Sequence, residues 1–317
     1  MAVAVLILGQ SGTGKSYSMK NFKEDELCLI SVQKALLPFR KKFTETVVTD
    51  KYGEIIKAMQ STKKKVIVID DTQYLMCNEF MRRATEKGYD KFTEIAQNFW
   101  SLVVQEVNKL PTDTIVYLLC HTATDENGVE KMKTIGKLVD EKITPEGLFT
   151  IVLKTAVSDG NYAFVTQNNG KDTVKSPEGM FTTYAINNDL KYVDEKIRNY
   201  YSLGEFLSDE EMAEIDEEAK NVEFEPPKSR EERKRRSRNT EETEQPQTER
   251  KQRKSREEVM AENDAKREAH SAATQEAINE AAGDRDELPF DEAEKAMASV
   301  DAPELEQPPR RRRRRTE

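Results

Sequence analysis

A glycine-rich turn follows the first apolar run of the chain. Residues 3–8, VAVLIL, are apolar and rich in β-branched side chains, and the next eight residues, GQSGTGKS, fit the pattern G-x-x-x-x-G-K-[ST]. In this pattern the glycines let backbone N–H groups curl around phosphate oxygens. The turn therefore predicts a buried strand that ends in a phosphate-binding loop, with a helix to follow.

This loop predicts a site for the cofactors ATP and Mg²⁺. Lys15 reaches the β and γ oxygens, which also makes it a catalytic candidate, and the Ser16 hydroxyl binds the metal ion. The residues expected to bind the nucleotide are Gly9, Gln10, Ser11, Gly12, Thr13, Gly14, Lys15, Ser16 and Tyr17.

Five short apolar runs define the expected fold. They do not alternate with polar residues, so they fit the strands of a parallel sheet that helices cover on both faces. The runs lie at residues 3–8, 27–31, 66–70, 114–120 and 149–157. Apolar residues at helical spacing over 92–110 predict a covering helix, and Asp159-Gly160 between apolar segments predicts a hairpin. The sequence thus predicts an α/β three-layer sandwich, mainly parallel, with an antiparallel edge.

A pair of carboxylates ends the third run. Asp70 is the expected Mg²⁺ ligand, because a P-loop nucleotide site needs a carboxylate at the end of a neighbouring strand. Asp71 has two interpretations. It either acts as the general base for the attacking water or caps the helix that follows.

A histidine ends the fourth run. His121 is the only histidine of residues 1–207, and Thr122 follows it as a weaker candidate for the same role. A polar group at the end of a strand beside the phosphate loop can sense the γ-phosphate or align the water, so His121 is a catalytic candidate. The alternative is a purely structural histidine.

The charge pattern divides the chain near Leu207. Residues 1–207 hold 27 basic and 27 acidic side chains, whereas residues 208–317 hold 23 and 32 and include only two aromatic residues. Residues 208–317 cannot bury enough apolar surface to form a core, so we expect a disordered charged tail, with a solvated helix over 256–282. No apolar run reaches the length of a membrane span, and the three dispersed cysteines indicate the cytoplasm.

The order of these motifs favours the ASCE branch of P-loop proteins, which hydrolyse ATP to drive rearrangements. The motifs and the segments 81–100, 118–122 and 164–181 resemble phage-encoded AAA or RecA-like ATP-binding proteins, single-domain recombinase relatives associated with single-strand annealing. The resemblance covers about residues 1–200. It implies a cytoplasmic ATPase that acts on single-stranded DNA in recombination or replication, as a homo-oligomer.

The resemblance also implies which loops face DNA. In RecA-like proteins these loops follow the third and fourth strands, and basic side chains there suit the phosphates of a single strand. The candidates in this sequence are Arg82, Arg83, Lys87, Lys131, Lys133 and Lys137. The alternative for both segments is a solvated surface loop.

The same family completes its active site with a cation from the neighbouring subunit. Lys171 and Lys175 match the position of such lysines, and Arg82 or Arg83 is a second option. The run Arg310 to Arg315 either binds nucleic acid or is a solvated charge run that pairs with the acidic blocks of the tail.

Two other classes of function remain open. One is a nucleotide-gated adaptor or loader that recruits a replication or recombination protein through its tail. The other is a small-molecule kinase, which the few arginines of residues 1–207 disfavour, because such enzymes clamp an anionic substrate with several arginines.

Overall fold

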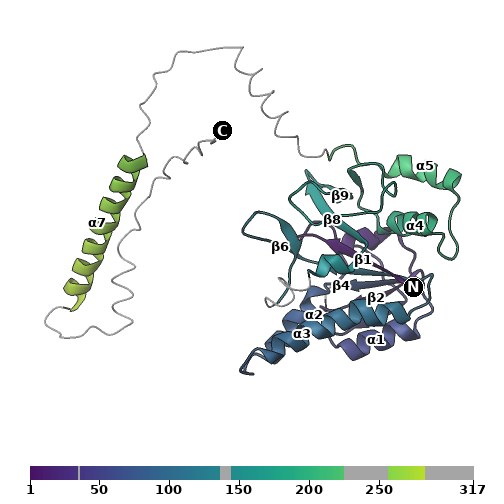
Figure 1. The fold of residues 1–317 in the computed structure, drawn as a ribbon, viewed down its shortest axis with the longest axis horizontal. Helices are drawn as coiled ribbons and strands as arrows, with labels where there is room; N and C mark the ends of the chain where they lie inside the picture. Colours follow the sequence, from purple (N-terminus) through teal and green to yellow (C-terminus); the bar gives the residue numbers. More distant parts are fainter. Residues whose placement is uncertain (35, 136–143, 225–255, 283–317) are drawn as a thin grey trace, which may run out of the picture. The chain divides into compact units, whose positions relative to one another are not determined.

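The structure is a computed structural model that describes residues 1–34, 36–135, 144–224 and 256–282. The chain divides into two compact units, Met1–Arg233 and Lys234–Glu317. The described residues of the second unit form one helix, α7 (Arg256–Ala282) (Figure 1). Every element discussed below belongs to the first unit.

An eight-stranded sheet forms the middle of the first unit. Its strand order is β10-β9-β8-β1-β5-β4-β2-β3, in which β8 to β3 run parallel and β9 and β10 form an antiparallel edge. The strands are β1 (Val3–Leu8), β2 (Leu27–Ser31), β3 (Glu45–Val48), β4 (Val66–Asp70), β5 (Ile115–Cys120), β8 (Ile151–Ser158), β9 (Asn161–Val165) and β10 (Ala185–Asn187). This confirms the predicted P-loop type of α/β fold with its antiparallel edge.

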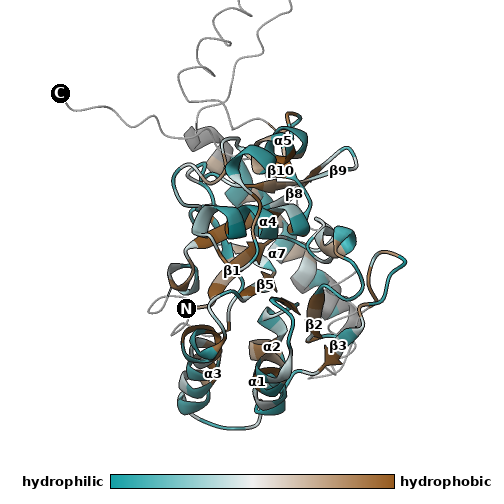
Figure 2. Ribbon diagram, turned by 90° about the vertical axis from the view of Figure 1, so that its right-hand side faces the viewer, coloured by the Kyte–Doolittle hydropathy of each residue, from teal (hydrophilic) through white to brown (hydrophobic). Residues whose placement is uncertain are grey.

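Helices cover both faces of the sheet, as the continuous burial of β2, β4 and β5 requires. One hydrophobic core lies between the sheet and α1, α2 and α3, and a second lies under α4 and α5 (Figure 1). Figure 2 shows hydrophobic strands between helices with hydrophilic outer faces. These helices are α1 (Tyr52–Ser61), α2 (Gln73–Arg82), α3 (Asp90–Trp100), α4 (Leu190–Tyr201) and α5 (Asp209–Ala219).

Two expected helices differ in type from the prediction. The helix expected after the phosphate loop is a short 3-10 helix, η1 (Ser16–Asn21). The helix predicted over 92–110 is α3, which continues as a π-helix, η2 (Ser101–Glu106), and a 3-10 turn, η3 (Val107–Lys109). The apolar spacing predicts the buried face of this segment but does not fix its hydrogen-bond pattern.

The parallel register brings three strand ends together. Leu8 at the end of β1 pairs with Cys120 at the end of β5, and Ile69 of β4 pairs with Leu118 of β5. Strand β5 therefore lies between the phosphate-loop strand and the strand that carries Asp70. The residues that follow these strands share one edge of the sheet.

A small hairpin and a short turn complete the described part of the unit. Strands β6 (Thr122–Thr124) and β7 (Glu130–Met132) pair as a separate antiparallel sheet directly after β5, and a 3-10 helix, η5 (Pro145–Leu148), precedes β8. None of the helices in the described ranges is long and apolar enough to cross a membrane.

The first unit extends beyond the boundary expected at Leu207. Helix α5 buries Met212 and Ala219 against the core under α4. Its Asp216 accepts a hydrogen bond from the Tyr192 hydroxyl (2.8 Å) and pairs with Lys196. The boundary between the folded unit and the tail therefore lies on the C-terminal side of α5. The apolar residues of this otherwise acidic helix pack against the core under α4.

Candidate functional site

The phosphate loop joins β1 to η1 with a conformation that needs glycine at specific positions. Gly12 and Gly14 adopt positive φ angles of 79° and 98°. Gly9 lies so close to the Thr155 and Thr13 hydroxyls that a Cβ atom has no room there. The loop thus has the curled backbone that directs N–H groups toward an anion.

Lys15 lies folded over this loop. Its side chain is buried, and Nζ donates hydrogen bonds to the carbonyl oxygens of Gly9 (3.0 Å) and Gln10 (2.9 Å). Burial lowers the pKa of the ammonium group, although the nearby carboxylates of Asp71 and Asp70 oppose this shift. Two carbonyl oxygens therefore hold the ammonium group, and the oxygens of a bound phosphate can replace them as its hydrogen-bond acceptors.

Ser16 and Asp70 form the expected metal side of the site. The Ser16 hydroxyl donates to Asp70 Oδ2 (2.8 Å), while Asp70 Oδ1 is buried and has no hydrogen-bond partner among the described residues. Burial and the neighbouring charge of Asp71 raise the pKa of Asp70 to about 6. A hydroxyl beside a buried carboxylate with an unused oxygen fits a Mg²⁺ ion, which takes oxygen ligands and few protein groups.

Asp71 projects into the site from a strained turn. Its φ angle is 60°, a left-handed conformation that is uncommon for residues other than glycine. Its carboxylate lies 3.4 Å from His121 Nε2. Thr72, the N-cap of α2, makes no side-chain capping bond in the described part of the chain. The geometry favours a role for the Asp71 carboxylate in the site over a role as a helix cap.

His121 is held in place from two sides. Its backbone N–H donates to Gln73 Oε1 (3.1 Å), and its carbonyl accepts from the Lys133 N–H (2.8 Å). Its ring stands edge-on to Tyr74, with ring centres 6.0 Å apart. Its neighbour Thr122 has a buried hydroxyl without a hydrogen-bond partner among the described residues. These contacts make His121 both a structural residue and a fixed neighbour of Asp71.

A cavity of about 660 Å³ joins these groups. Its lining combines the phosphate loop, one carboxylate, one histidine, three tyrosines and two apolar residues from the loop after β2. Its lining consists of Ser11, Gly12, Gly14, Lys15, Ser16, Tyr17, Leu36, Pro38, Asp71, Tyr74, His121 and Tyr162. The structure therefore brings the predicted loop, the carboxylate Asp71 and His121 to one hollow.

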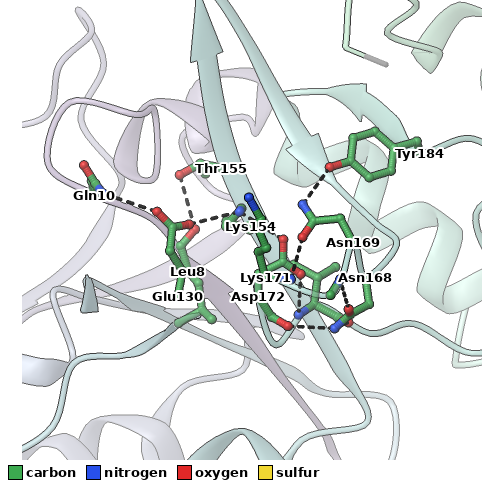
Figure 3. A network of polar contacts seen from close by, with 12 residues as sticks. Leu8, Gln10, Glu130, Lys154, Thr155, Asn168, Asn169, Lys171, Asp172 and Tyr184 are labelled. Carbon is green, nitrogen blue, oxygen red and sulfur yellow. Dashed lines mark hydrogen bonds and ion pairs between the residues drawn. The ribbon is translucent and has the colours of Figure 1, made fainter. Parts of the chain in front are cut away.

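The sequence did not predict the contacts that the phosphate loop makes with β8 and with the β6–β7 hairpin. Thr155 of β8 shares a hydrogen bond with Thr13 (2.6 Å) and donates to the Leu8 carbonyl (3.2 Å). Gln10 donates to Glu130 (3.3 Å), which also pairs with Lys154 (2.9 Å) (Figure 3). A polar Lys-Thr pair inside the fifth apolar run was the only sequence signal for this contact.

The two arginines proposed for DNA are engaged elsewhere. Arg82 pairs with Asp50, and Arg83 pairs with three glutamates, Glu79, Glu86 and Glu94. Charges that are already compensated attract phosphates less strongly, so these arginines are weak candidates for DNA and for a cation supplied in trans. The sequence prediction did not anticipate their carboxylate partners.

The lysine candidates have different surroundings. Lys87 and Lys133 are exposed, and Lys131 is half-buried on β7. Lys137 lies outside the described residues. Lys171 is exposed, whereas half-buried Lys175 exchanges two backbone hydrogen bonds with Val152 of β8. Lys171 is therefore the more accessible of the two lysines proposed to act in trans.

Comparisons with known proteins give limited information. No protein-family model and no curated protein matches the sequence. A solved structure with some similarity is the ATPase DotB of Legionella pneumophila, with 8% sequence identity and a TM-score of 0.25 over 69% of this chain. The chain spans 61% of the length of that structure. A likeness this low carries no argument about function, so the function rests on the site itself.

Proposed function

We propose that the chain is a Mg²⁺-dependent ATPase that acts on single-stranded DNA as an oligomer. The observation that supports it is the convergence of Lys15, Ser16, Asp71 and His121 on one cavity, with Asp70 bonded to Ser16 beneath it. These residues come from the phosphate loop and from the ends of β4 and β5. The chemistry of these groups matches phosphoryl transfer to water.

Each side chain has a role in this reaction. Lys15 turns from the loop carbonyls to the β and γ oxygens and offsets their charge. Asp71 accepts a proton from the attacking water, and His121 fixes the orientation of that carboxylate. Ser16 and Asp70 would hold Mg²⁺, which would supply a positive charge that stabilises the phosphate oxygens.

The hairpin β6–β7 supports the DNA part of the proposal. It follows His121 directly, and it presents the exposed Lys133 beside Lys131 at the same end of the sheet as the phosphate loop. The Lys133 N–H donates to the His121 carbonyl (2.8 Å), so this hairpin is joined directly to the residue that faces Asp71. Exposed Lys87 and Lys171 remain candidates for DNA binding and for action in trans.

The test is the rate of ATP hydrolysis with and without single-stranded DNA at about 0.1 M salt. We expect DNA to raise the rate of the wild type, and we expect Lys15→Ala to abolish hydrolysis. Asp71→Asn should lower the rate by about 10²- to 10⁴-fold while ATP still binds, since loss of a general base acts on the chemical step. Asp25→Asn, which changes an exposed carboxylate, is the matched control.

The other classes of function give different results. Binding of ATP without hydrolysis, under all DNA conditions, contradicts the ATPase and favours the nucleotide-gated adaptor. Transfer of the γ-phosphate to an added acceptor, in place of release to water, favours the kinase. Hydrolysis that single-stranded DNA leaves unchanged removes the DNA part of the proposal.

A further inference from the structure

Two tyrosine rings, Tyr17 and Tyr162, form an aromatic wall beside the phosphate loop. Tyr17 follows the loop serine, and Tyr162 comes from β9, more than 140 residues further along the chain. Their ring centres are 5.6 Å apart with the planes tilted by 45°. Both rings line the same cavity as the loop. Neither ring has a role in the chemistry proposed above.

The sheet order places this wall opposite the reactive groups. Asp71 and His121 follow β4 and β5, on one side of β1, whereas β9 lies on the other side, beyond β8. A triphosphate that rests in the loop with its terminal phosphate toward Asp71 and His121 directs its other end away from them. That end of the cavity is where Tyr17 and Tyr162 lie.

A buried amide without partners lies behind this wall. Asn188 is 4% exposed, and neither its Oδ1 nor its Nδ2 has a hydrogen-bond partner among the described residues. A Cβ atom on Gly14 would meet Tyr162 at 2.8 Å and Asn188 Oδ1 at 3.1 Å, so both side chains lie close to the phosphate loop. The Asn188 backbone N–H donates to the Tyr162 carbonyl (3.2 Å). Asn188 does not line the cavity, so it supports Tyr162 from beneath the cavity surface.

We propose that Tyr17 and Tyr162 form the nucleobase subsite of the nucleotide and that Asn188 positions Tyr162. The base stacks on the Tyr162 ring beside Tyr17, while Asn188, whose backbone N–H donates to the Tyr162 carbonyl (3.2 Å), holds Tyr162 next to Gly14. An aromatic ring can stack on the face of any base. The subsite rests on the nucleotide binding proposed above. It gives a binding site to the base, the part of the ligand that the phosphate loop does not contact.

The test separates the base from the phosphates. Binding of Mg-ATP and of Mg-tripolyphosphate, which has no base, is measured for the wild type, Tyr162→Leu, Tyr162→Phe and Asn188→Leu. Because base stacking contributes roughly 1–3 kcal/mol, we expect Tyr162→Leu to weaken ATP binding by about tenfold or more. Tripolyphosphate binding should stay within about twofold of the wild type. Tyr162→Phe keeps the ring and should keep the affinity for ATP.

Asn188→Leu tests whether Asn188 positions the Tyr162 ring. We expect it to weaken ATP binding severalfold, to leave tripolyphosphate binding unchanged and to leave the unfolding midpoint in urea no lower than that of the wild type. Tyr89→Leu, which changes an exposed tyrosine outside the cavity, is the control and should alter neither ligand.

Two results for the Tyr162→Leu variant would overturn the subsite. One is equal weakening of ATP and tripolyphosphate in Tyr162→Leu, which indicates general damage to the loop. The other is unchanged ATP binding in Tyr162→Leu. A wild type that binds tripolyphosphate and ATP equally well also excludes a base subsite, whereas a wild type that binds neither contradicts the proposed function itself.

Discussion

Gly9 is the residue at which the phosphate loop and the sheet approach most closely. A methyl group there collides with the hydroxyls of Thr155 and Thr13. Gly9→Ala should destabilise the unit by about 1–3 kcal/mol, the usual cost of an extra carbon in a tightly packed site. Urea unfolding measures this loss. In a Thr155→Ala background the cost should be smaller, because the closest clashing atom is gone; an equal cost in both backgrounds would contradict the contact.

His121 and Asp71 illustrate how one residue can act through another. His121→Ala removes the group that faces the Asp71 carboxylate at 3.4 Å. We expect the rate constant of hydrolysis to fall by about 10²-fold, the size of effect that follows from a misplaced reactive group. The affinity for ATP should change by less than about threefold. His270→Ala, which changes a histidine of α7, is the control; a loss of affinity equal to the loss of rate would assign His121 to binding.

At the scale of elements, an ion cluster ties β8 to β7 and to the loop after β9 (Figure 3). Lys154 pairs with Glu130 (2.9 Å) and with Asp172 (3.0 Å), whose side chain is fully buried. Lys154→Met leaves the Asp172 carboxylate without its partner, so we expect a loss of about 3–5 kcal/mol in the free energy of unfolding. Denaturant unfolding provides the measurement.

Two further variants identify the cause of this loss. Adding Asp172→Asn to Lys154→Met removes the unpaired charge and should restore part of the stability. Lys63→Met changes an exposed lysine and should alter stability by no more than about 0.5 kcal/mol. A Lys154→Met variant as stable as Lys63→Met would show that the cluster does not hold these elements together.

These elements also show what the sequence could and could not predict. The phosphate loop, the parallel strands and the convergence of Asp71 with His121 followed from local patterns, because strand ends in a parallel sheet share an edge. Tyr162 and Asn188 did not, since the pairing of β9 with β8 and of β10 with β9 brings them to Gly14. The family resemblance predicted Arg83 as a DNA contact, yet its carboxylate partners come from α2, the turn after it and α3, which fold around it.

At the scale of the whole molecule, α5 decides where the folded unit ends. The sequence predicts α5 as part of a charged tail, because most of its residues are acidic. In the structure it buries Met212 and places Asp216 beside Tyr192 and Lys196. Burial of one methionine side chain contributes about 1.5–3 kcal/mol. A chain that stops at Leu207 should therefore lose about 3 kcal/mol in the free energy of unfolding relative to the full chain.

A chain that stops at Arg233, the end of the first compact unit, is the matched comparison. It keeps α5 and should unfold within about 0.5 kcal/mol of the full chain in urea. Equal stability of the two truncated chains would show that α5 contributes nothing to the core. Because α4 packs on both α5 and η1, the segment after the phosphate loop, the shorter chain should also bind Mg-ATP more weakly than the longer one.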